Sequence, residues 1–274
     1  MSVSAKIKRV FVRSKIEYFA PIAYSDCRKT RPYLADRLPF ATGSVLVFLL
    51  PYYVGETENF SRYAASLDYH HVIKAVSDSI ICDLKKEYPN ESFAAFGDHS
   101  PIDERHAALV TGLGVLGDNG LLINEKYGSY VFIGEIFTSL APREVGAISP
   151  LPIARCEGCG ACAAACLTGR LSGGGECLSE ITQRKGELSP SDIELMRKIN
   201  TVWGCDECQI ACPHNKNPIV TPIELFWGNR ITVLTESLIN GMSDGEFALR
   251  AFSWRCKETV LRNIRAVNKK KDPV

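Results

Sequence analysis

The sequence lacks three features that would each define a class of protein. Its formal net charge is only +1 over 274 residues, which argues against a main role in coating nucleic acid or an anionic membrane. Its most apolar run, residues 43–51, is far shorter than the ~20 residues of a membrane-spanning helix. Its first residues, MSVSAKIKRVFVRSK, contain no apolar segment or cleavage site of a secretory signal. We therefore expect a cytoplasmic protein with no membrane partner.

What the sequence does have is an unusual number of cysteines in an otherwise ordinary globular composition. The chain is 46% hydrophobic and 23% charged, and its length suits one large domain or two modest ones. It holds eleven cysteines, eight of them between residues 156 and 212. A disulfide scaffold would be short and secreted, whereas clustered cysteines in the cytoplasm usually hold metal.

The spacing of these cysteines indicates iron–sulfur clusters. The strings CEGCGACAAAC (156–166) and CDECQIACP (205–213) form two runs, the first with ligands at two-residue intervals. In such runs three cysteines bind one cube and the fourth binds a different cluster. The simplest assignment gives the first cluster Cys156, Cys159, Cys162 and Cys212. It gives the second cluster Cys166, Cys205 and Cys208, and the other cysteine in this region is Cys177.

Two alternatives accompany this assignment. Structural zinc could explain the whole set, although zinc sites use two separated cysteine pairs. Cys177 on its own could be a buried thiol, because cysteine is often buried. The isolated Cys27, Cys82 and Cys256 are predicted to be packing residues.

The sequence pattern predicts alternating helices and strands before the cysteine runs. We expect strands at 44–51, 92–97, 121–124 and 129–137, the last two joined by the turn EKYG. We expect helices from Ser61 to about Lys86, at 104–110 and, with a capped start, at 189–200. Residues 26–37 read as a loop broken by Pro32, and the last ~50 residues as helical stretches before a Lys269–Lys271 tail. The predicted domains are 1–150, 151–220 and 221–274.

Residues 112–117, GLGVLG, match the dinucleotide fingerprint G-x-G-x-x-G, but in the wrong context. The fingerprint is meaningful only between a strand and the helix it opens. Here the segment before it is predicted helical and the segment after it a strand. A Rossmann site for a nicotinamide or flavin is therefore disfavoured, and we expect a glycine-rich loop that lets backbone approach a large flat ligand.

Seven strings in fixed order carry a family resemblance. They are SRYAASLDYHHVIK (61–74), FGDHSPIDERHAA (96–108), GLGVLGDNGLLIN (112–124), GSYVFIGEI (128–136), CEGCGACAAAC (156–166), ECLSEIT (176–182) and GCDECQIACPHN (204–215). In order and approximate spacing they resemble the epoxyqueuosine reductases, and more distantly the cobalamin-dependent reductive dehalogenases. The resemblance implies an α+β fold: a flavin-reductase-like α/β domain that binds cobalamin, then a ferredoxin-like domain with two [4Fe-4S] clusters. It implies an oxidoreductase that removes the epoxide oxygen in the last step of queuosine synthesis on tRNA.

The resemblance also implies roles for individual residues. Cys177 matches the lone cysteine of the family pattern and would complete the second cluster. Asp98, in DHSP, matches the catalytic aspartate that donates a proton to the leaving oxygen, beside the cobalamin. Its neighbour His99 could adjust or replace that acid. The cofactor-binding residues implied in addition to Asp98 are Gly112, Gly114, Gly117, Asn119 and Asp206.

Further matches to the family are given structural interpretations. Asp68, Tyr69 and His70 match its D-Y-H and are interpreted mainly as structural. Glu104 and Arg105 match its E-R, with a salt-bridged helix start as the plain alternative.

The sequence also departs from the family pattern. Val115 and Asp118 replace a tryptophan and a lysine, Leu167 replaces a proline, and His214 replaces a tryptophan. Only 62 residues follow Cys212, so we expect a short form without the C-terminal helical-repeat domain and with a weakened grip on tRNA. The expected electron donor is a low-potential ferredoxin or flavodoxin. Alternatives are the same machinery on another substrate, such as an organohalide or a small molecule, or a non-enzymatic electron-transfer or corrinoid-handling protein.

Overall fold

A computed structural model describes residues 2–269, and contacts within it separate the chain into two units. The first unit runs to Tyr52 and continues through His70–Gly158 and Thr221–Ile223. The second unit comprises Tyr53–Tyr69, Cys159–Val220 and the chain from Glu224 onward. The three-domain division expected from the sequence stays a prediction. In the described part of the chain, no helix combines the length and apolar character needed to cross a membrane.

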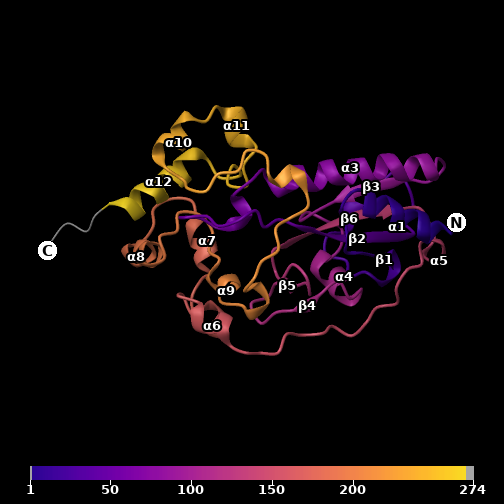
Figure 1. Ribbon diagram of the computed structural model, residues 1–274, viewed down its shortest axis with the longest axis horizontal. Helices are drawn as coiled ribbons and strands as arrows, with labels where there is room; N and C mark the ends of the chain where they lie inside the picture. The colour runs from indigo at the N-terminus through magenta and orange to yellow at the C-terminus, as the bar shows by residue number, and fades with distance from the viewer. Residues whose placement is uncertain (1, 270–274) are drawn as a thin grey trace. The chain divides into compact units, whose positions relative to one another are not determined.

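The first unit is built on a four-stranded antiparallel sheet in the order β1-β2-β6-β3 (Figure 1). Its strands are β1 (Phe19–Ala23), β2 (Ser44–Pro51), β6 (Val131–Thr138) and β3 (Phe93–Phe96). All eight residues of β2 are buried, as expected for the apolar run predicted to be a strand. The predicted combination of helices and strands is confirmed.

One face of this sheet packs against helix α4 (Glu104–Val110), which has the bounds predicted for it. Alternate residues of a strand point to the same face of a sheet. Val45, Val47 and Leu49 of β2 accordingly share one buried cluster with Ala107 and Val110 of α4. The polar loop 98–103, which follows edge strand β3, leads directly into this helix.

The opposite face packs against helix α1 (Val3–Arg13). The Phe11 ring stacks on Phe19 at 4.4 Å between centroids and meets Phe48 edge-on at 5.7 Å. Gly134 of β6 lies opposite Phe48, and a Cβ there would come within 2.4 Å of the Phe48 ring. Glycine at 134 therefore makes room for this aromatic packing.

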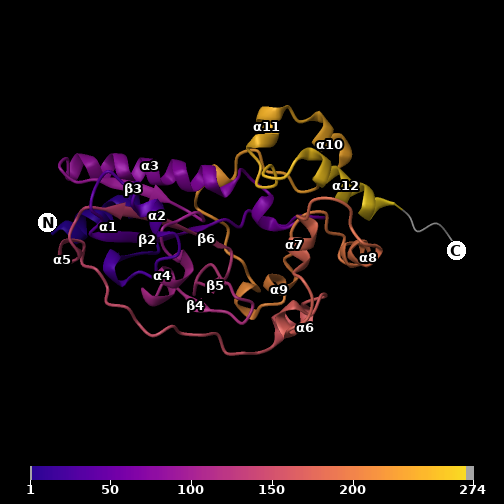
Figure 2. The same ribbon diagram turned by 180° about the vertical axis from the view of Figure 1, so that it is seen from behind.

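Helix α3 (Tyr69–Glu87) runs alongside β3 in both Figure 1 and Figure 2. The prediction that this helix begins at Ser61 is wrong. The backbone of 61–68 instead bonds to distant segments of the second unit, with the Asp68 N–H donating to Leu249 O and Ala65 O accepting from Ile231 N, both at 2.8 Å. Partners remote in sequence thus override a helical pattern of apolar residues.

One other local prediction needs correction, and a second is confirmed with an added detail. The predicted loop 26–37 contains a short helix, α2 (Pro32–Ala35), because proline is well suited to the first position of a helix. The turn EKYG is present, bridged by Asn124 and Gly128. The strands it joins have different partners: β5 (Leu122–Ile123) pairs with β4 (Val115–Leu116), whereas β6 pairs with β2 and β3.

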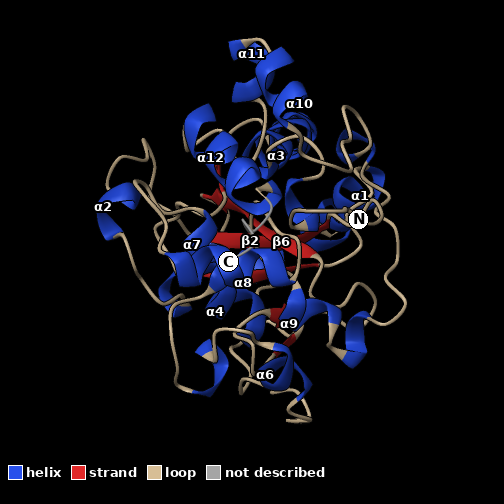
Figure 3. Cartoon of the chain, turned by 90° about the vertical axis from the view of Figure 1, so that its left-hand side faces the viewer, coloured by secondary structure: helices blue, strands red, loops and turns tan. Residues whose placement is uncertain are grey.

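The second unit consists of short helices joined by loops, the helices coloured blue in Figure 3. Helix α8 (Pro190–Lys198) begins with the predicted cap, in which the Ser189 hydroxyl accepts the Asp192 N–H at 3.1 Å. The expected C-terminal helices are α10 (Glu236–Gly241), α11 (Asp244–Ala248) and α12 (Lys257–Asn268). Of the predicted lysine tail, Lys270 and Lys271 lie outside the described residues.

The remaining elements are short. In the first unit lies α5 (Pro142–Val145), and in the second lie α6 (Ala161–Ala165), α7 (Leu178–Thr182) and α9 (Glu207–Ile210). Single 3-10 turns occupy Tyr24–Asp26, Arg62–Ala64, Arg170–Ser172, Pro213–Asn215 and Glu224–Phe226.

Candidate functional site

Asp98 lies in the polar loop between β3 and α4, with an unusual backbone conformation. Its φ is +61°, in the left-handed region that costs a non-glycine residue about 1–2 kcal/mol and that aspartate tolerates better than most. Its carboxylate is 60% exposed, and Oδ2 lies 3.3 Å from Nε2 of His70, in the first turn of α3. The structure thus presents a solvent-accessible carboxylate paired with an imidazole.

Glu104, the first residue of α4, holds the Asp98 backbone. Its Oε2 accepts the Asp98 N–H at 2.8 Å. The pKa of the Glu104 carboxyl is raised to about 7, mainly by burial and in part by the nearby carboxylates of Asp98 and Asp103, against the lowering effect of the Asp98 N–H. The start of α4 is also salt-bridged, as the plain alternative expected: its N-cap Asp103 pairs with Arg28 at 3.6 Å, while Arg105 donates to the carbonyl of Gly120.

A second acid, Glu135 of β6, is fully buried on the face of the sheet that packs against α4. Ser100, two residues after Asp98, donates its hydroxyl to Oε2 of Glu135. Within residues 2–269, Oε1 of Glu135 has no hydrogen-bond partner. Burial raises the pKa of Glu135 well above its ordinary value, and the nearby Glu104 raises it further. The sequence does not point to this residue, because an acid in the apolar string YVFIGEI gives no local signal of function.

A cavity of about 320 Å³ lies beside the Asp98 loop, between α3 and the edge strand β3. Gly97 and His99, the two neighbours of Asp98, line it together with His70. Lys74 also lines it and pairs with Asp78 at 2.6 Å. The loop therefore borders a space with imidazole and ammonium groups.

The glycine-rich loop has the inverted context predicted from the sequence, with α4 before it and β4 within it. Gly114 and Gly117 are explained by close approach inside this loop. A Cβ at either would come within 2.5 Å of another atom, Ile123 O and Asn119 Oδ1 respectively. Gly112 has a φ of +75°, which favours glycine.

Asn119 in the same loop has an orphaned donor. Its Oδ1 accepts the Leu121 N–H at 3.2 Å, but its buried Nδ2 has no partner among the described residues. Buried donors are nearly always satisfied by protein, water or ligand. Asn119 therefore fits a residue that donates to a bound cofactor.

Four of the predicted ligand cysteines are electrostatic neighbours in the second unit. The pKa values of Cys205 and Cys208 are raised to about 12, mainly by burial and in part by the nearby Cys177. The nearby Cys162 also contributes to the raised pKa of Cys208. The fold thus brings Cys177 to the second run, as the sequence prediction for the second cluster requires.

Cys166, at the end of the first run, is adapted to the thiolate form. Burial would raise its pKa, but hydrogen bonds from the N–H groups of residues 168, 170 and 171, and from the Thr168 hydroxyl, outweigh burial and lower it. Iron binds thiolates rather than thiols. Cys166 therefore fits an iron ligand on chemical grounds independent of spacing.

The remaining cysteines differ from one another. Cys27 is buried as predicted, but Cys82 and Cys256 are exposed, so their prediction as packing residues is wrong. Each lies on a helix face or boundary open to solvent, which cysteine spacing does not reveal.

Across residues 2–269, no three His, Cys, Asp or Glu side chains converge as a single metal ion would require. In a [4Fe-4S] cube each cysteine binds the cluster rather than one shared ion.

Asp206, between Cys205 and Cys208, is used inside the second unit. Its buried carboxylate accepts hydrogen bonds from the Ser61 hydroxyl, from the Arg62 N–H at 2.8 Å and from Nη1 of Arg62 at 3.3 Å. These contacts attach the second cysteine run to the irregular segment before α3. The role of Asp206 as a cofactor contact stays a prediction.

Comparison with known proteins first defines the class. Residues 155–215 match the family described as a 4Fe-4S double cluster binding domain. The chain is therefore an iron–sulfur protein with a double-cluster domain, and the ferredoxin interpretation of the two cysteine runs is confirmed over structural zinc.

Further comparisons identify the proteins that this chain resembles. An epoxyqueuosine reductase from Lactococcus garvieae is 32% identical over 218 residues, which cover 75% of this chain and 60% of that protein. An epoxyqueuosine reductase crystallised with an epoxyqueuosine-modified tRNA-Tyr stem loop has a TM-score of 0.76 at 23% identity, covering 97% of this chain and 81% of the other. A Bacillus subtilis epoxyqueuosine reductase, whose catalytic aspartate loop is swung out of the active site, has a TM-score of 0.73 at 21% identity and coverage of 97% and 82%.

These comparisons confirm the resemblance to epoxyqueuosine reductases. The solved structures show that this chain shares their fold, and the curated relative shows similarity in sequence. The matched region spans less than two thirds of the length of that relative.

Proposed function

We propose that the chain is an iron–sulfur and cobalamin-dependent reductase that removes the epoxide oxygen from epoxyqueuosine, with Asp98 as the proton donor. The observation that carries this proposal is the Asp98 loop. Asp98 has a left-handed backbone conformation that Glu104 holds, and its exposed carboxylate pairs with His70. The neighbours of Asp98, Gly97 and His99, line a cavity. Strained residues cluster at functional sites, where the surrounding structure holds them in place.

The proposed reaction consumes two electrons and two protons. The epoxide loses its oxygen as water, and a carbon–carbon double bond takes its place. A donor of the ferredoxin or flavodoxin class would supply the electrons, and the two clusters, when bound, would provide the route for electron transfer. An alkoxide is a poor leaving group, so a positioned acid typically contributes ~10²–10⁴-fold to such a step.

Residues of this chain would hold and supply the first proton. Asp98 in its acid form donates to the leaving oxygen, and the imidazole of His70, 3.3 Å away, is placed to return a proton to it. Glu104 keeps the Asp98 backbone in place during this exchange. His99 lines the same cavity and is the alternative acid.

The cobalamin proposal rests on the glycine-rich loop. The buried Nδ2 of Asn119 has no partner within the described chain, and that donor fits an acceptor on a bound cofactor. Bound cobalamin would supply a strongly reducing cobalt centre for cleavage of the carbon–oxygen bond. Gly112, Gly114 and Gly117 would shape the loop, and Asn119 would donate the hydrogen bond.

The proposed cluster ligands follow the sequence assignment. The first cluster takes Cys156, Cys159, Cys162 and Cys212, and the second takes Cys166, Cys177, Cys205 and Cys208. The low pKa of Cys166 and the proximity of Cys177 to the second run support the second set.

The proposed substrate is epoxyqueuosine carried by tRNA. A related reductase crystallised with a modified tRNA stem loop supports this choice. With a net charge of +1, the chain has little general attraction for phosphate, so binding should depend mainly on the modified nucleotide and weakly on salt.

The test is turnover under anaerobic conditions with a strong chemical reductant. The substrates are an epoxyqueuosine-modified tRNA stem loop, the free nucleoside and a halogenated phenol. We expect queuosine from the stem loop and a loss of ~10²–10⁴-fold in Asp98→Asn with its cofactors retained. Asp83→Asn, which alters a surface acid on α3, is the control.

Near-wild-type turnover by Asp98→Asn would overturn the role of Asp98. Turnover of the phenol alone would replace the proposed substrate, and no turnover of any of the three would favour an electron-transfer protein.

A further inference from the structure

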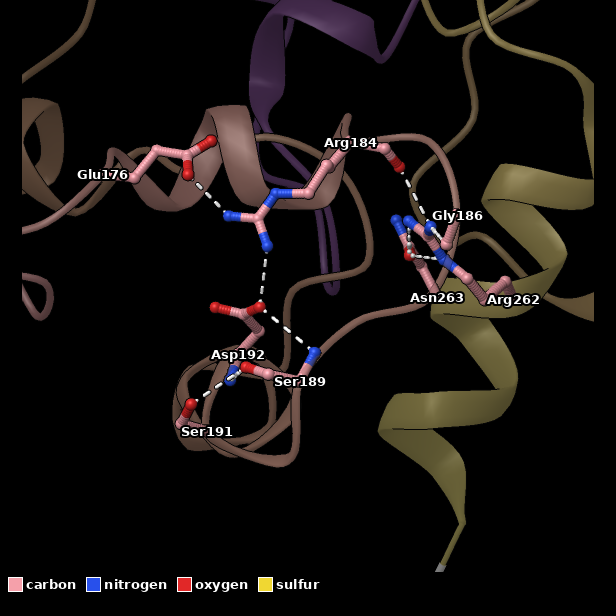
Figure 4. Close-up of polar contacts among 8 residues, drawn as sticks. All are labelled: Glu176, Arg184, Gly186, Ser189, Ser191, Asp192, Arg262 and Asn263. Carbon is pink, nitrogen blue, oxygen red and sulfur yellow. Dashed lines mark hydrogen bonds and ion pairs between the residues drawn. The ribbon is translucent and has the colours of Figure 1, made fainter.

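Asn263 of the C-terminal helix α12 is fully buried and connects two segments of the second unit. Its Nδ2 donates to Thr182 O at 2.6 Å and to Val202 O at 2.8 Å. Its Oδ1 accepts from Nε and Nη2 of Arg262, at 3.1 and 2.8 Å. Figure 4 shows Arg262 beside Asn263 on the helix. The neighbouring arginine thus fixes the amide so that its N–H groups reach both carbonyls.

The two carbonyls belong to segments that carry predicted ligands of the second cluster. Thr182 ends helix α7, and Cys177 is the residue that caps the start of that helix. Val202 lies three residues before Cys205. Asn263 therefore connects the segment of Cys177 to the segment of Cys205.

A second contact joins the same two segments independently of α12. The Thr182 hydroxyl accepts the Gly204 N–H at 2.8 Å and donates to Ser179 O at 2.8 Å. Gly204 immediately precedes Cys205, so this bond fixes the start of the second cysteine run. A buried network whose members are all satisfied makes a segment rigid.

Apolar packing converges on the same place. Leu178, Ile181 and Met196 form a small buried cluster. Val267 of α12 packs against this cluster. So do Cys205 and Leu167, the residue after Cys166. Three segments with predicted ligands of the second cluster thus meet at one small apolar cluster, to which α12 contributes Val267.

The neighbouring polar contacts serve a different segment. Arg262 donates to Arg184 O at 2.9 Å and also to Gly186 O. Arg184 in turn pairs with Glu176 at 2.5 Å and with Asp192 at 2.9 Å (Figure 4). This network orders the loop between α7 and α8, which carries no cysteine.

We propose that Asn263 is a positioning residue for the second [4Fe-4S] cluster. Its side chain sets the spacing between Cys177 and the Cys205 run. The inference rests on the proposed ligand set of that cluster. A cube needs its thiolates at fixed positions before it can assemble. Loss of the Asn263 amide leaves two buried carbonyls without their donor and frees the two segments to separate. The C-terminal helix would thereby control assembly of this cluster although it supplies no ligand.

The test compares Asn263→Ala with Arg265→Ala, a variant of the same helix whose side chain is exposed and pairs with Glu236. Both are reconstituted anaerobically with iron and sulfide, and iron per chain and the electron paramagnetic resonance spectrum of the reduced protein are measured. Wild type and Arg265→Ala should hold about eight irons. Asn263→Ala should hold about four, a twofold loss, with the spectrum of one isolated cluster.

Variants of Thr182 keep the test decisive if Asn263→Ala fails to fold. Thr182→Val removes the acceptor for Gly204 N–H and leaves α12 untouched, whereas Thr182→Ser keeps the hydroxyl. Selective loss of four irons in Thr182→Val, with rescue in Thr182→Ser, supports the proposal. Circular dichroism of the metal-free proteins reports folding separately.

Two results would overturn the inference. One is full retention of both clusters, with an unchanged spectrum, in Asn263→Ala. The other is equal loss of both clusters in both Asn263→Ala and Thr182→Val, which would show a general effect on folding. Neither readout uses substrate. A chain that binds eight irons but turns over no substrate would therefore contradict the proposed function and leave this inference standing.

Discussion

The Oε2 atom of Glu104 accepts the backbone N–H of Asp98 at 2.8 Å, and this bond joins the start of α4 to a residue with a φ of +61°. An unfavourable backbone conformation persists only where its surroundings hold it. The acid proposed to act on substrate is thus positioned by a second acid six residues along the chain.

This contact predicts different turnover for two substitutions at Glu104. Glu104→Ala removes the acceptor and should lower kcat about tenfold or more, because 1.4 kcal/mol of lost positioning corresponds to a factor of ten. Glu104→Gln keeps an oxygen that can accept the Asp98 N–H and should stay within about twofold of wild type on the same scale. Steady-state turnover measures both, and equal losses in the two variants would contradict the positioning role.

The pairing of His70 with Asp98 predicts an effect on turnover rather than on binding. His70→Ala removes the group placed to return a proton to Asp98 and should lower kcat about tenfold, with KM unchanged. His71→Ala, at an exposed neighbouring position on the same helix, is the matched control and should have no effect. A loss confined to KM, or an equal loss in the control, would rule out this role.

The sequence predicts the parts of this site that depend on local pattern. The run SVLVFLLP gives β2 with its correct bounds, and Ser189 followed by Pro190 gives the start of α8. The spacing of the cysteines gives the double-cluster domain. Each of these signals lies within one strand, one helix start or one cysteine run.

The features of the fold and the site that the sequence does not predict depend on contacts between residues far apart in the chain. The segment 61–68 has helical spacing but bonds to residues 231 and 249, and Asp206 is held by Ser61 and Arg62. The sequence favours a structural role for His70, because its proximity to Asp98 arises only when α3 packs beside β3. Glu135 gave no signal, since its partner Ser100 lies 35 residues away.

Glu135 predicts how stability changes with pH. Burial raises its pKa in the folded protein, so the folded state holds a proton that the unfolded state releases above about pH 4.3. Its contribution to stability is therefore complete below that pH and is lost as the pH rises toward the folded pKa, by about 1.4 kcal/mol per pH unit. Glu104, whose pKa is raised to about 7, acts in the same direction.

The measurement is urea unfolding of the metal-free protein at pH 5, 6, 7 and 8. In Glu135→Gln the free energy of unfolding should fall less over this range than in wild type. In Glu104→Gln the free energy of unfolding should depend less on pH than in wild type below pH 7. Identical slopes for wild type and Glu135→Gln would contradict a neutral, buried Glu135.

The proposed ligand set predicts a difference between two cysteines. Cys177→Ser should lower iron from about eight to about four per chain, since it removes one thiolate of the second cluster. Cys256→Ser alters an exposed thiol outside the ligand set and should keep the full complement. Iron analysis after anaerobic reconstitution reads the result, and a Cys177→Ser protein with both clusters intact would return Cys177 to the role of a buried thiol.

The most direct measurement of the central claim is elemental analysis of the anaerobically purified chain, after supply of iron, sulfide and cobalamin. The account predicts about eight irons, about eight sulfides and one cobalt per chain, from two four-iron clusters and one corrinoid. Zinc in place of iron, or eight irons without cobalt, would contradict it.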